Sequence, residues 1–227
     1  KQVWNATLEE NRLVLRRTSP HMEEGFPGNL QVSIAYTLTD DNALHIAYEA
    51  DTDADTILNL TNHSYFNLNG GGTALNHTLQ LFADEFTQNN SACLPTGKYL
   101  SVADTPFDFR IPKPLGRDIL AENEQLACGK GYDHNFVLTG KGVRPIALLV
   151  GDQSGIRMTC LTCQPGVQLY SANFLTPRKG KNGSTMGYRD GVCLETQGFP
   201  NAPNIAHFPS CVLAKGQHFE SETVYKF

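Results

Sequence analysis

Hydrophobic and polar side chains alternate along much of the chain with a period of two, the period of a β-strand. Over residues 32–38 every second residue is Val, Ile, Tyr or Leu, and the residues between them are Ser, Ala and Thr. The alternation resumes over residues 44–48, after the turn-forming run Asp40-Asp41-Asn42. Two such runs joined by a short Asp/Asn turn are typical of a hairpin. The pattern therefore predicts an antiparallel hairpin over residues 32–48.

Three further stretches have the same alternation. Residues 146–150 and 156–160 flank the turn sequence Gly-Asp-Gln-Ser-Gly, and this arrangement predicts a second hairpin. The C-terminal residues 219–227 also alternate and predict a final strand. Strands that recur along the chain with turns between them favour a fold built from antiparallel sheets.

Loops and a single short helix complete the predicted organisation. Residues 67–76 and 176–190 are rich in Gly, Pro and Asn and are expected to form long loops. Only residues 118–128 have a helical pattern. We therefore predict an all-β fold, a large antiparallel β-sandwich with functional loops, in which residues 1–227 form a single domain.

Composition and charge exclude several classes of protein. The 227 residues have a formal net charge of −5, and no Lys/Arg cluster is longer than a pair such as Arg16-Arg17, so we expect no nucleic-acid partner. The longest aliphatic run, residues 146–150, is far shorter than the roughly 20 residues of a membrane span. The first residues have no apolar run of the kind that a signal peptide carries. We therefore expect a cytoplasmic protein without a membrane partner.

Six cysteines and seven histidines raise the question of disulfides and metals. A chain of this size without a secretory signal favours reduced thiols. Cys160 and Cys163 have the spacing of a metal-binding pair, but residues three apart on a strand point to opposite faces. Their neighbourhood has no second pair and no His, so we expect no set of metal ligands.

Two polar segments contain candidate acid–base groups. His63 follows an apolar strand-like run and precedes a glycine-rich loop, and imidazole exchanges protons near neutral pH. A histidine that only forms a hydrogen bond at a strand end is the alternative. Asp133 and Asn135 share one face of a second segment, with Tyr132 and His134 on the other. An Asp/Asn turn capped by its own side chains is the alternative there.

Two strand-like segments contain further candidates. Glu195 shares a face with Cys193 and Gln197, and a carboxylate on an apolar strand should be paired, located at the mouth of a pocket, or shifted in pKa. A structural salt bridge is the alternative for this residue. Gln168 shares a face with Tyr170, and its amide can both donate to and accept from sugar hydroxyls. A hydrogen bond to a neighbouring edge strand is the alternative for Gln168.

Taken together, these segments resemble one family, the aldose 1-epimerases or galactose mutarotases. The likeness extends from end to end and keeps the family's order. It is carried by Glu-Glu-Gly-Phe-Pro-Gly-Asn-Leu at 23–30, Thr-Asn-His-Ser-Tyr-Phe-Asn-Leu at 61–68, Tyr-Asp-His-Asn-Phe at 132–136, Gln-Leu-Tyr-Ser-Ala-Asn-Phe-Leu at 168–175, Leu-Glu-Thr-Gln at 194–197, Phe-Pro at 208–209 and Leu-Ala-Lys-Gly at 213–216.

The resemblance implies a fold, an activity and a set of site residues. Members of the family fold as a large β-sandwich, the mutarotase-like supersandwich, and interconvert the α and β anomers of hexoses such as galactose and glucose without metal or organic cofactor. The family's catalytic acid falls on His63 and its catalytic base on Glu195. Asp133 and Gln168 match positions that bind substrate hydroxyls or orient the sugar ring. His134 matches no catalytic role and is interpreted as supporting.

One departure from the family pattern keeps other functions open. Trp4 matches a family Trp that an Asn-Arg pair and a further sugar-binding His precede, so the resemblance implies a fold incomplete at its N-terminus. A non-catalytic carbohydrate-binding or regulatory module of the same fold is therefore one alternative. An epimerase acting on hexose 6-phosphates is another, with Arg178, Lys179 and Lys181 as its phosphate clamp. The oligomeric state and the choice between galactose and glucose stay open.

Overall fold

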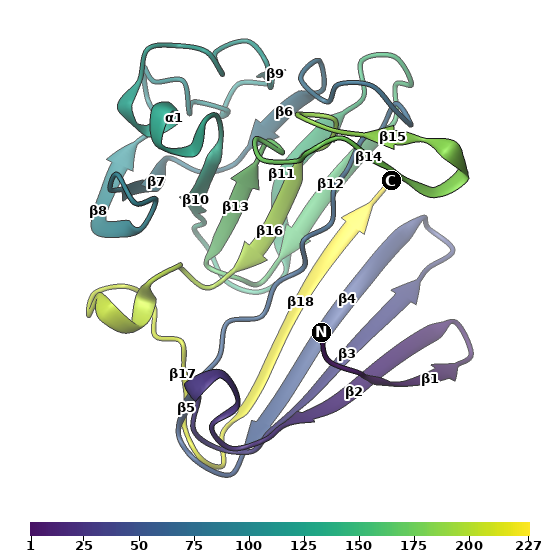
Figure 1. Ribbon diagram of the computed structural model, residues 1–227, viewed down its shortest axis with the longest axis vertical. Helices are drawn as coiled ribbons and strands as arrows, with labels where there is room; N and C mark the ends of the chain where they lie inside the picture. Colours follow the sequence, from purple (N-terminus) through teal and green to yellow (C-terminus); the bar gives the residue numbers. More distant parts are fainter.

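Two antiparallel sheets dominate the computed structural model, which describes residues 1–227 apart from the side chain of residue 182 (Figure 1). The larger sheet has nine strands in the spatial order β1 (Asn5–Glu9), β2 (Arg12–Ser19), β3 (Leu30–Leu38), β4 (Ala43–Thr52), β18 (His218–Lys226), β12 (Arg157–Thr162), β11 (Arg144–Val150), β6 (Thr78–Leu81) and β9 (Lys113–Pro114). The smaller sheet has five, in the order β16 (Cys193–Gln197), β13 (Gly166–Tyr170), β10 (Asp133–Val137), β7 (Glu85–Asn89) and β8 (Pro95–Ser101).

Short elements lie between the strands of the two sheets. β14 (Arg178–Lys179) pairs with β15 (Thr185–Met186) to form one two-stranded ribbon. β17 (Val212–Leu213) pairs with β5 (Thr56–Ile57) to form another. The helical segments are α1 (Glu124–Gly129) and the 3₁₀ turns Glu23–Gly25, Lys181–Gly183 and Ala202–Asn204. None of the helices in the described part of the chain has the length and apolar character that crossing a membrane requires.

The strands predicted from alternation are confirmed. β3 and β4 pair as one hairpin, with Leu38 opposite Leu44, and β11 and β12 pair as the other, with Val150 opposite Arg157. The predicted C-terminal strand is β18. It pairs with β4 on one side and β12 on the other, so it joins the two hairpins into one sheet (Figure 1).

The predicted helix over residues 118–128 is wrong over its first half. The helix begins only at Glu124, where the Asn123 side chain accepts hydrogen bonds from the backbone N–H groups of residues 125 and 126. This is the usual role of Asn at a helix N-cap. Residues 118–123 form turns instead, and the Asp118 carboxylate accepts a 2.7 Å bond from Lys113 Nζ. An ion pair with Lys113 of β9 therefore outweighs helix propensity over this stretch.

The two sheets pack against each other around a shared apolar core. Phe86, Phe136 and Leu169 from the smaller sheet lie in one buried cluster with Leu79 and Ile146 from the larger sheet. Alternate residues of each strand supply this core, so the residues between them face outward. The predicted antiparallel sandwich is thus observed, and the outward face of the smaller sheet is free to carry polar chemistry.

The larger sheet is wider than the smaller one. Its β1–β4 end extends away from the five-stranded sheet in Figure 1, and every residue of β1 is exposed. The other half of the nine-stranded sheet and the whole smaller sheet enclose most of the core described above. The candidate site lies on this closed half of the molecule.

Candidate active site

The four side chains singled out from the sequence line one cavity. His63, Asp133, Gln168 and Glu195 all contribute to a hollow of about 370 Å³. This volume is in the range of about 300–1,000 Å³ that small-molecule sites occupy. The remaining lining residues are Tyr65, Tyr170, Phe174, Gln197 and Pro200.

Strand register brings three of these residues together. In the smaller sheet Gln168 on β13 lies directly opposite Glu195 on β16 and, on its other side, opposite Asn135 on β10. Asp133 is two residues from Asn135 and shares its face. The residues between them, such as Leu169 and Leu194, point into the core. One face of three neighbouring strands is therefore apolar and buried, and the other supplies two carboxyls and an amide.

His63 reaches the same place from a loop. It lies between β5 and β6, in a segment that Phe66 anchors to the start of β16 by two backbone hydrogen bonds with Val192, of 2.8 and 2.9 Å. The Tyr225 hydroxyl on β18 donates a 3.0 Å bond to Asn62 Oδ1 and fixes the residue before His63. These contacts place the imidazole over the edge strand that carries Glu195.

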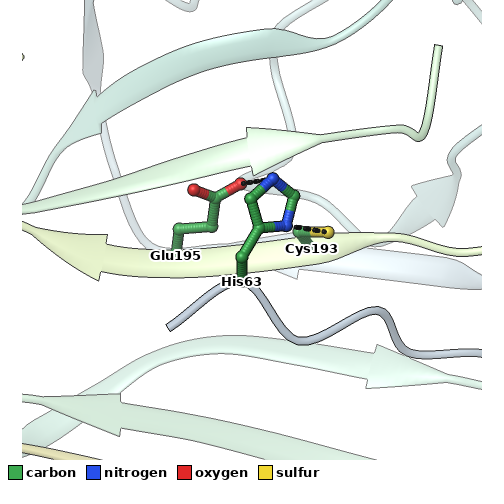
Figure 2. Close-up of side chains that lie close together, drawn as sticks. All are labelled: His63, Cys193 and Glu195. Carbon is green, nitrogen blue, oxygen red and sulfur yellow. Dashed lines mark hydrogen bonds and ion pairs between the residues drawn. The ribbon is translucent and has the colours of Figure 1, made fainter. Parts of the chain in front are cut away.

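The imidazole of His63 lies between a carboxylate and a thiol. Its Nε2 is 3.6 Å from Glu195 Oε1, and its Nδ1 is 3.4 Å from Cys193 Sγ (Figure 2). The ring stacks on Tyr65, with 4.9 Å between centroids, and meets the edge of Tyr170 at 5.8 Å. Aromatic contacts on two sides hold the ring plane, while about half of the side chain stays exposed to the cavity.

The electrostatics of the cavity raise the proton affinity of its carboxyls. Burial, and secondarily the charge of Asp133, raises the pKa of Glu195 from 4.5 to about 7. Burial also raises the pKa of Asp133. The 2.8 Å hydrogen bond that Gln168 Nε2 donates to Asp133 lowers this pKa, and so does the nearby His63, but burial has the larger effect. Glu195 can therefore both accept and return a proton near neutral pH, as a general base must.

His134 faces the other way, into the core. It is fully buried against Phe86 and Phe107, and burial lowers its pKa to about 4, which keeps the ring neutral. Its Nδ1 accepts a 3.1 Å hydrogen bond from the backbone N–H of Asp133. His134 thus helps to hold the strand that presents Asp133 and does not line the cavity.

The expectation that no set of metal ligands exists is corrected by the tertiary structure. Ligand atoms of His63, Cys193 and Glu195 all lie within 4.8 Å of one another. The imidazole, however, presents Nε2 to the carboxylate and Nδ1 to the thiol, on different sides of the ring. The two shortest contacts of the ring therefore use different nitrogens. Burial also raises the pKa of Cys193 far above its usual value and disfavours the thiolate that a metal would need.

The sequence indicated some of the other cavity residues and missed the rest. The strand period places Tyr170 beside Gln168 and Gln197 beside Glu195. Tyr65 and Phe174 carry only the weak signal of an aromatic residue in a polar loop, a signal that most core aromatics share. Their position in the cavity follows from how the loops fold over the sheet.

The sequence profile of the family described as aldose 1-epimerase matches residues 1–226. The chain belongs to this family. Its relatives include a galactose mutarotase from Bos taurus, 40% identical over the whole chain and 66% of the relative, and an aldose 1-epimerase from Haemophilus influenzae, 38% identical over the whole chain and 68% of the relative. The chain thus spans about two thirds of the length of these family members.

Solved structures of family members have the same fold. An aldose epimerase homologue from C. elegans superposes with a TM-score of 0.88 at 33% identity, over 98% of this chain and 67% of the other. A galactose 1-epimerase from Lactobacillus acidophilus superposes with a TM-score of 0.84 at 31% identity, over 99% of this chain and 66% of the other. The galactose mutarotase-like fold expected from the sequence is therefore confirmed.

Proposed function

We propose that this chain carries the acid–base centre of an aldose 1-epimerase that interconverts the α and β anomers of free hexoses. The observation that carries the proposal is the contact between His63 and Glu195 in one cavity, 3.6 Å apart, with the pKa of Glu195 raised to about 7. Family membership supports the reaction class. The imidazole is the acid and the carboxylate the base.

Ring opening needs two proton transfers at one anomeric centre. Glu195 accepts the proton of the O1 hydroxyl as the C1–O5 bond breaks, and His63 donates its Nε2 proton to the departing O5. The product is the open-chain aldehyde, with one proton added to each of Glu195 and O5 and one removed from each of O1 and His63. Because O1 and O5 are bonded to the same carbon, two groups that lie side by side can serve both.

Ring closure reverses these transfers on the other carbonyl face. Rotation about C1–C2 presents that face to O5, His63 takes the O5 proton as the C1–O5 bond forms, and Glu195 returns a proton to O1. Each positioned transfer contributes about 10²–10⁴-fold to the rate. The two groups recover their starting protonation, so the cycle needs no external acid or base.

The remaining cavity residues suit a sugar ring. Asp133 and Gln168 are already hydrogen-bonded to each other, and Gln197 Nε2 lies 3.5 Å from Gln168 Oε1. A connected row of carboxylate and amides can donate to and accept from several hydroxyls. Tyr65 and Tyr170 supply an apolar wall beside it. We assign substrate hydroxyls to Asp133 and Gln168 on this basis.

A phosphorylated hexose is less well matched. The basic candidates for a phosphate clamp, Arg178 and Lys179, form the short exposed strand β14, and neither they nor Lys181 is among the described residues that line the cavity. Exposed cations of this kind contribute little to binding unless geometry holds them. Free hexoses are therefore the proposed substrates.

The proposal is tested by polarimetry on α-galactose and α-glucose. We expect His63→Ala and Glu195→Gln each to lower the catalysed rate of mutarotation by at least about 10²-fold while the circular dichroism spectrum is unchanged. Lys181→Ala, on the exposed ribbon loop, is the control and should retain the parental rate. Parental rates in either site variant would refute the assignment. Sugar binding by the parent protein without any acceleration would instead favour the non-catalytic module.

A further inference from the structure

Two cysteines outside the cavity lie close together on neighbouring elements. All six cysteines are free thiols, and Cys93 Sγ is 2.8 Å from Cys128 Sγ. Cys93 is in the turn between β7 and β8, and Cys128 is in α1. Each thiol also approaches the other segment's backbone: Cys93 Sγ is 3.1 Å from the Cys128 carbonyl oxygen, and Cys128 Sγ is 3.1 Å from that of Asn90. A disulfide bond is about 2.05 Å long, so a shift of less than about 1 Å would join the sulfurs.

The turn that carries Cys93 is held without help from the sulfurs. The Asn90 N–H donates to the Leu94 carbonyl at 2.9 Å, and the Cys93 N–H donates to the Asn90 carbonyl at 2.9 Å. The Asn90 side chain also accepts from the backbone N–H groups of Ala92 and Leu94. Five residues are thus fixed by four hydrogen bonds, and Cys93 itself has a left-handed backbone with φ of 59°.

The helix that carries Cys128 is fastened to the same hairpin by another route. The Gln125 amide accepts a 2.8 Å bond from the Asn89 N–H and donates a 3.0 Å bond to the Asn89 carbonyl. Leu126 packs into the main core. Both partners of the thiol pair are therefore positioned by contacts that do not depend on a bond between them.

We propose that Cys93 and Cys128 form a reversible intramolecular disulfide that fastens α1 to the β7–β8 turn. Cys93 is exposed and can meet an oxidant from solution, whereas Cys128 is half-buried behind it. The oxidant class is a low-molecular-weight disulfide such as glutathione disulfide. This inference is independent of the proposed epimerase activity.

The exchange proceeds in two balanced steps. The Cys93 thiolate attacks a sulfur of glutathione disulfide, forms a mixed disulfide and releases one glutathione thiolate. The Cys128 thiolate then attacks the Cys93 sulfur and releases the second. The two cysteines lose two electrons and two protons, and glutathione disulfide gains both as two thiols. Burial and the neighbouring Cys93 raise the pKa of Cys128 to about 11, so Cys93 is the residue that reacts first.

Peptide mapping of the full chain tests the bond directly. The protein is equilibrated with mixtures of glutathione disulfide and glutathione, alkylated and digested. We expect a cross-linked peptide pair containing Cys93 and Cys128, lighter than the free pair by two hydrogen atoms, with the other four cysteines alkylated. Cys93→Ser should abolish the pair, while Cys211→Ser, at another half-buried cysteine, should leave it intact. Recovery of Cys93 only as a free thiol or a glutathione adduct would overturn the proposal.

Thermal unfolding provides a second, independent readout. A disulfide that closes residues 93–128 without distorting the fold should raise the unfolding midpoint of the oxidised protein by roughly 5 °C or more over the reduced protein. The shift should vanish in Cys93→Ser and persist in Cys211→Ser. An unchanged or lower midpoint in the cross-linked protein would show that the thiol pair is not preset for the bond, and would equally count against the proposal.

Discussion

The Glu195 carboxyl is mostly buried, yet it lines the cavity and contacts the imidazole of His63. It is flanked on its strand by core residues, faces a cavity with only about an eighth of its side chain exposed, and contacts the imidazole of His63. Desolvation disfavours its charged form, and the nearby Asp133 adds repulsion. The same environment that makes Glu195 a base near neutral pH makes its ionised form costly to the folded state. The raised pKa of Glu195 should therefore affect the pH dependence of both catalysis and stability.

The first concerns the pH dependence of catalysis. Because the base must be ionised, kcat/KM should rise with pH on the acidic side of its profile, with a midpoint at about pH 7, the pKa of Glu195. Asp133→Asn removes the neighbouring negative charge and should move the midpoint of this rise to lower pH. Initial rates of mutarotation measured from pH 5 to 9, with the buffer-catalysed rate subtracted, provide the test. A midpoint that stays in place in the Asp133 variant would contradict the electrostatic coupling.

The second concerns stability. The folded protein holds the Glu195 proton up to about pH 7, whereas the unfolded chain releases it near 4.5, so ionisation removes stability as pH rises through this window. Glu195→Gln cannot ionise and should escape the loss. We compare the free energy of unfolding of the variant with that of the parent at pH 4 and at pH 8. Between these two pH values the difference should shift in favour of the variant by on the order of 2 kcal/mol, allowing for solvent screening. Urea unfolding measures both differences, and equal differences at the two pH values would contradict a raised pKa of Glu195 in the folded protein.

At the scale of elements, local caps and loop contacts decide where α1 begins. Asn123 supplies the only side-chain oxygen described at its N-terminus, and it accepts from two backbone N–H groups. Upstream, Lys113 is nearly completely buried and donates to both Asp118 and the Pro106 carbonyl. The turn that these contacts stabilise prevents an earlier start, although the residues themselves tolerate a helix.

The cap therefore has a measurable contribution. Asn123→Ala leaves two N–H groups of the first helical turn without their acceptor and should lower the free energy of unfolding by about 1 kcal/mol. Asn76→Ala, at an exposed loop position, is the matched control and should change it by less than about 0.5 kcal/mol. Chemical denaturation of the three proteins compares the values. Equal stability of both variants would mean that packing alone holds α1.

For the whole molecule, the core that the two sheets share stabilises the fold and also supports the site. Phe136 on β10 is fully buried among Phe86, Phe107 and Phe109, three residues from Asp133 on the same strand. Its packing helps to hold β10, the strand from which Asp133 projects into the cavity.

Core and edge should respond differently to truncation. Phe136→Ala should cost about 3–5 kcal/mol, because it removes a buried ring and leaves a cavity that the surrounding aromatics only partly fill. Leu8→Ala on β1, where the side chain is 77% exposed, should change stability by less than about 0.5 kcal/mol. Thermal and urea unfolding give both values. A comparable loss at Leu8 would indicate that the exposed end of the large sheet is packed in solution.

Strand alternation and turn residues were enough to locate the two hairpins and the final strand, because neighbours in sequence set the faces of a strand and the sharpness of a turn. The same parity placed Gln168 beside Tyr170 and Glu195 beside Cys193 and Gln197. Local propensity misplaced the start of α1, because the buried Lys113 of β9 binds Asp118. Resemblance of whole motifs, rather than periodicity, selected His63 and Glu195 from among several polar residues.

Contacts between segments that are distant in the sequence determined the arrangement of the site and of the thiol pair. The Phe66–Val192 bridge brings His63 onto β16, and strand pairing sets Gln168 beside Glu195, neither of which alternation alone can specify. The raised pKa of Glu195 and the approach of Cys93 to Cys128 likewise depend on what surrounds each group in space. Desolvation and charge coupling act through distance and burial, and the chain acquires both only when its two sheets close on each other.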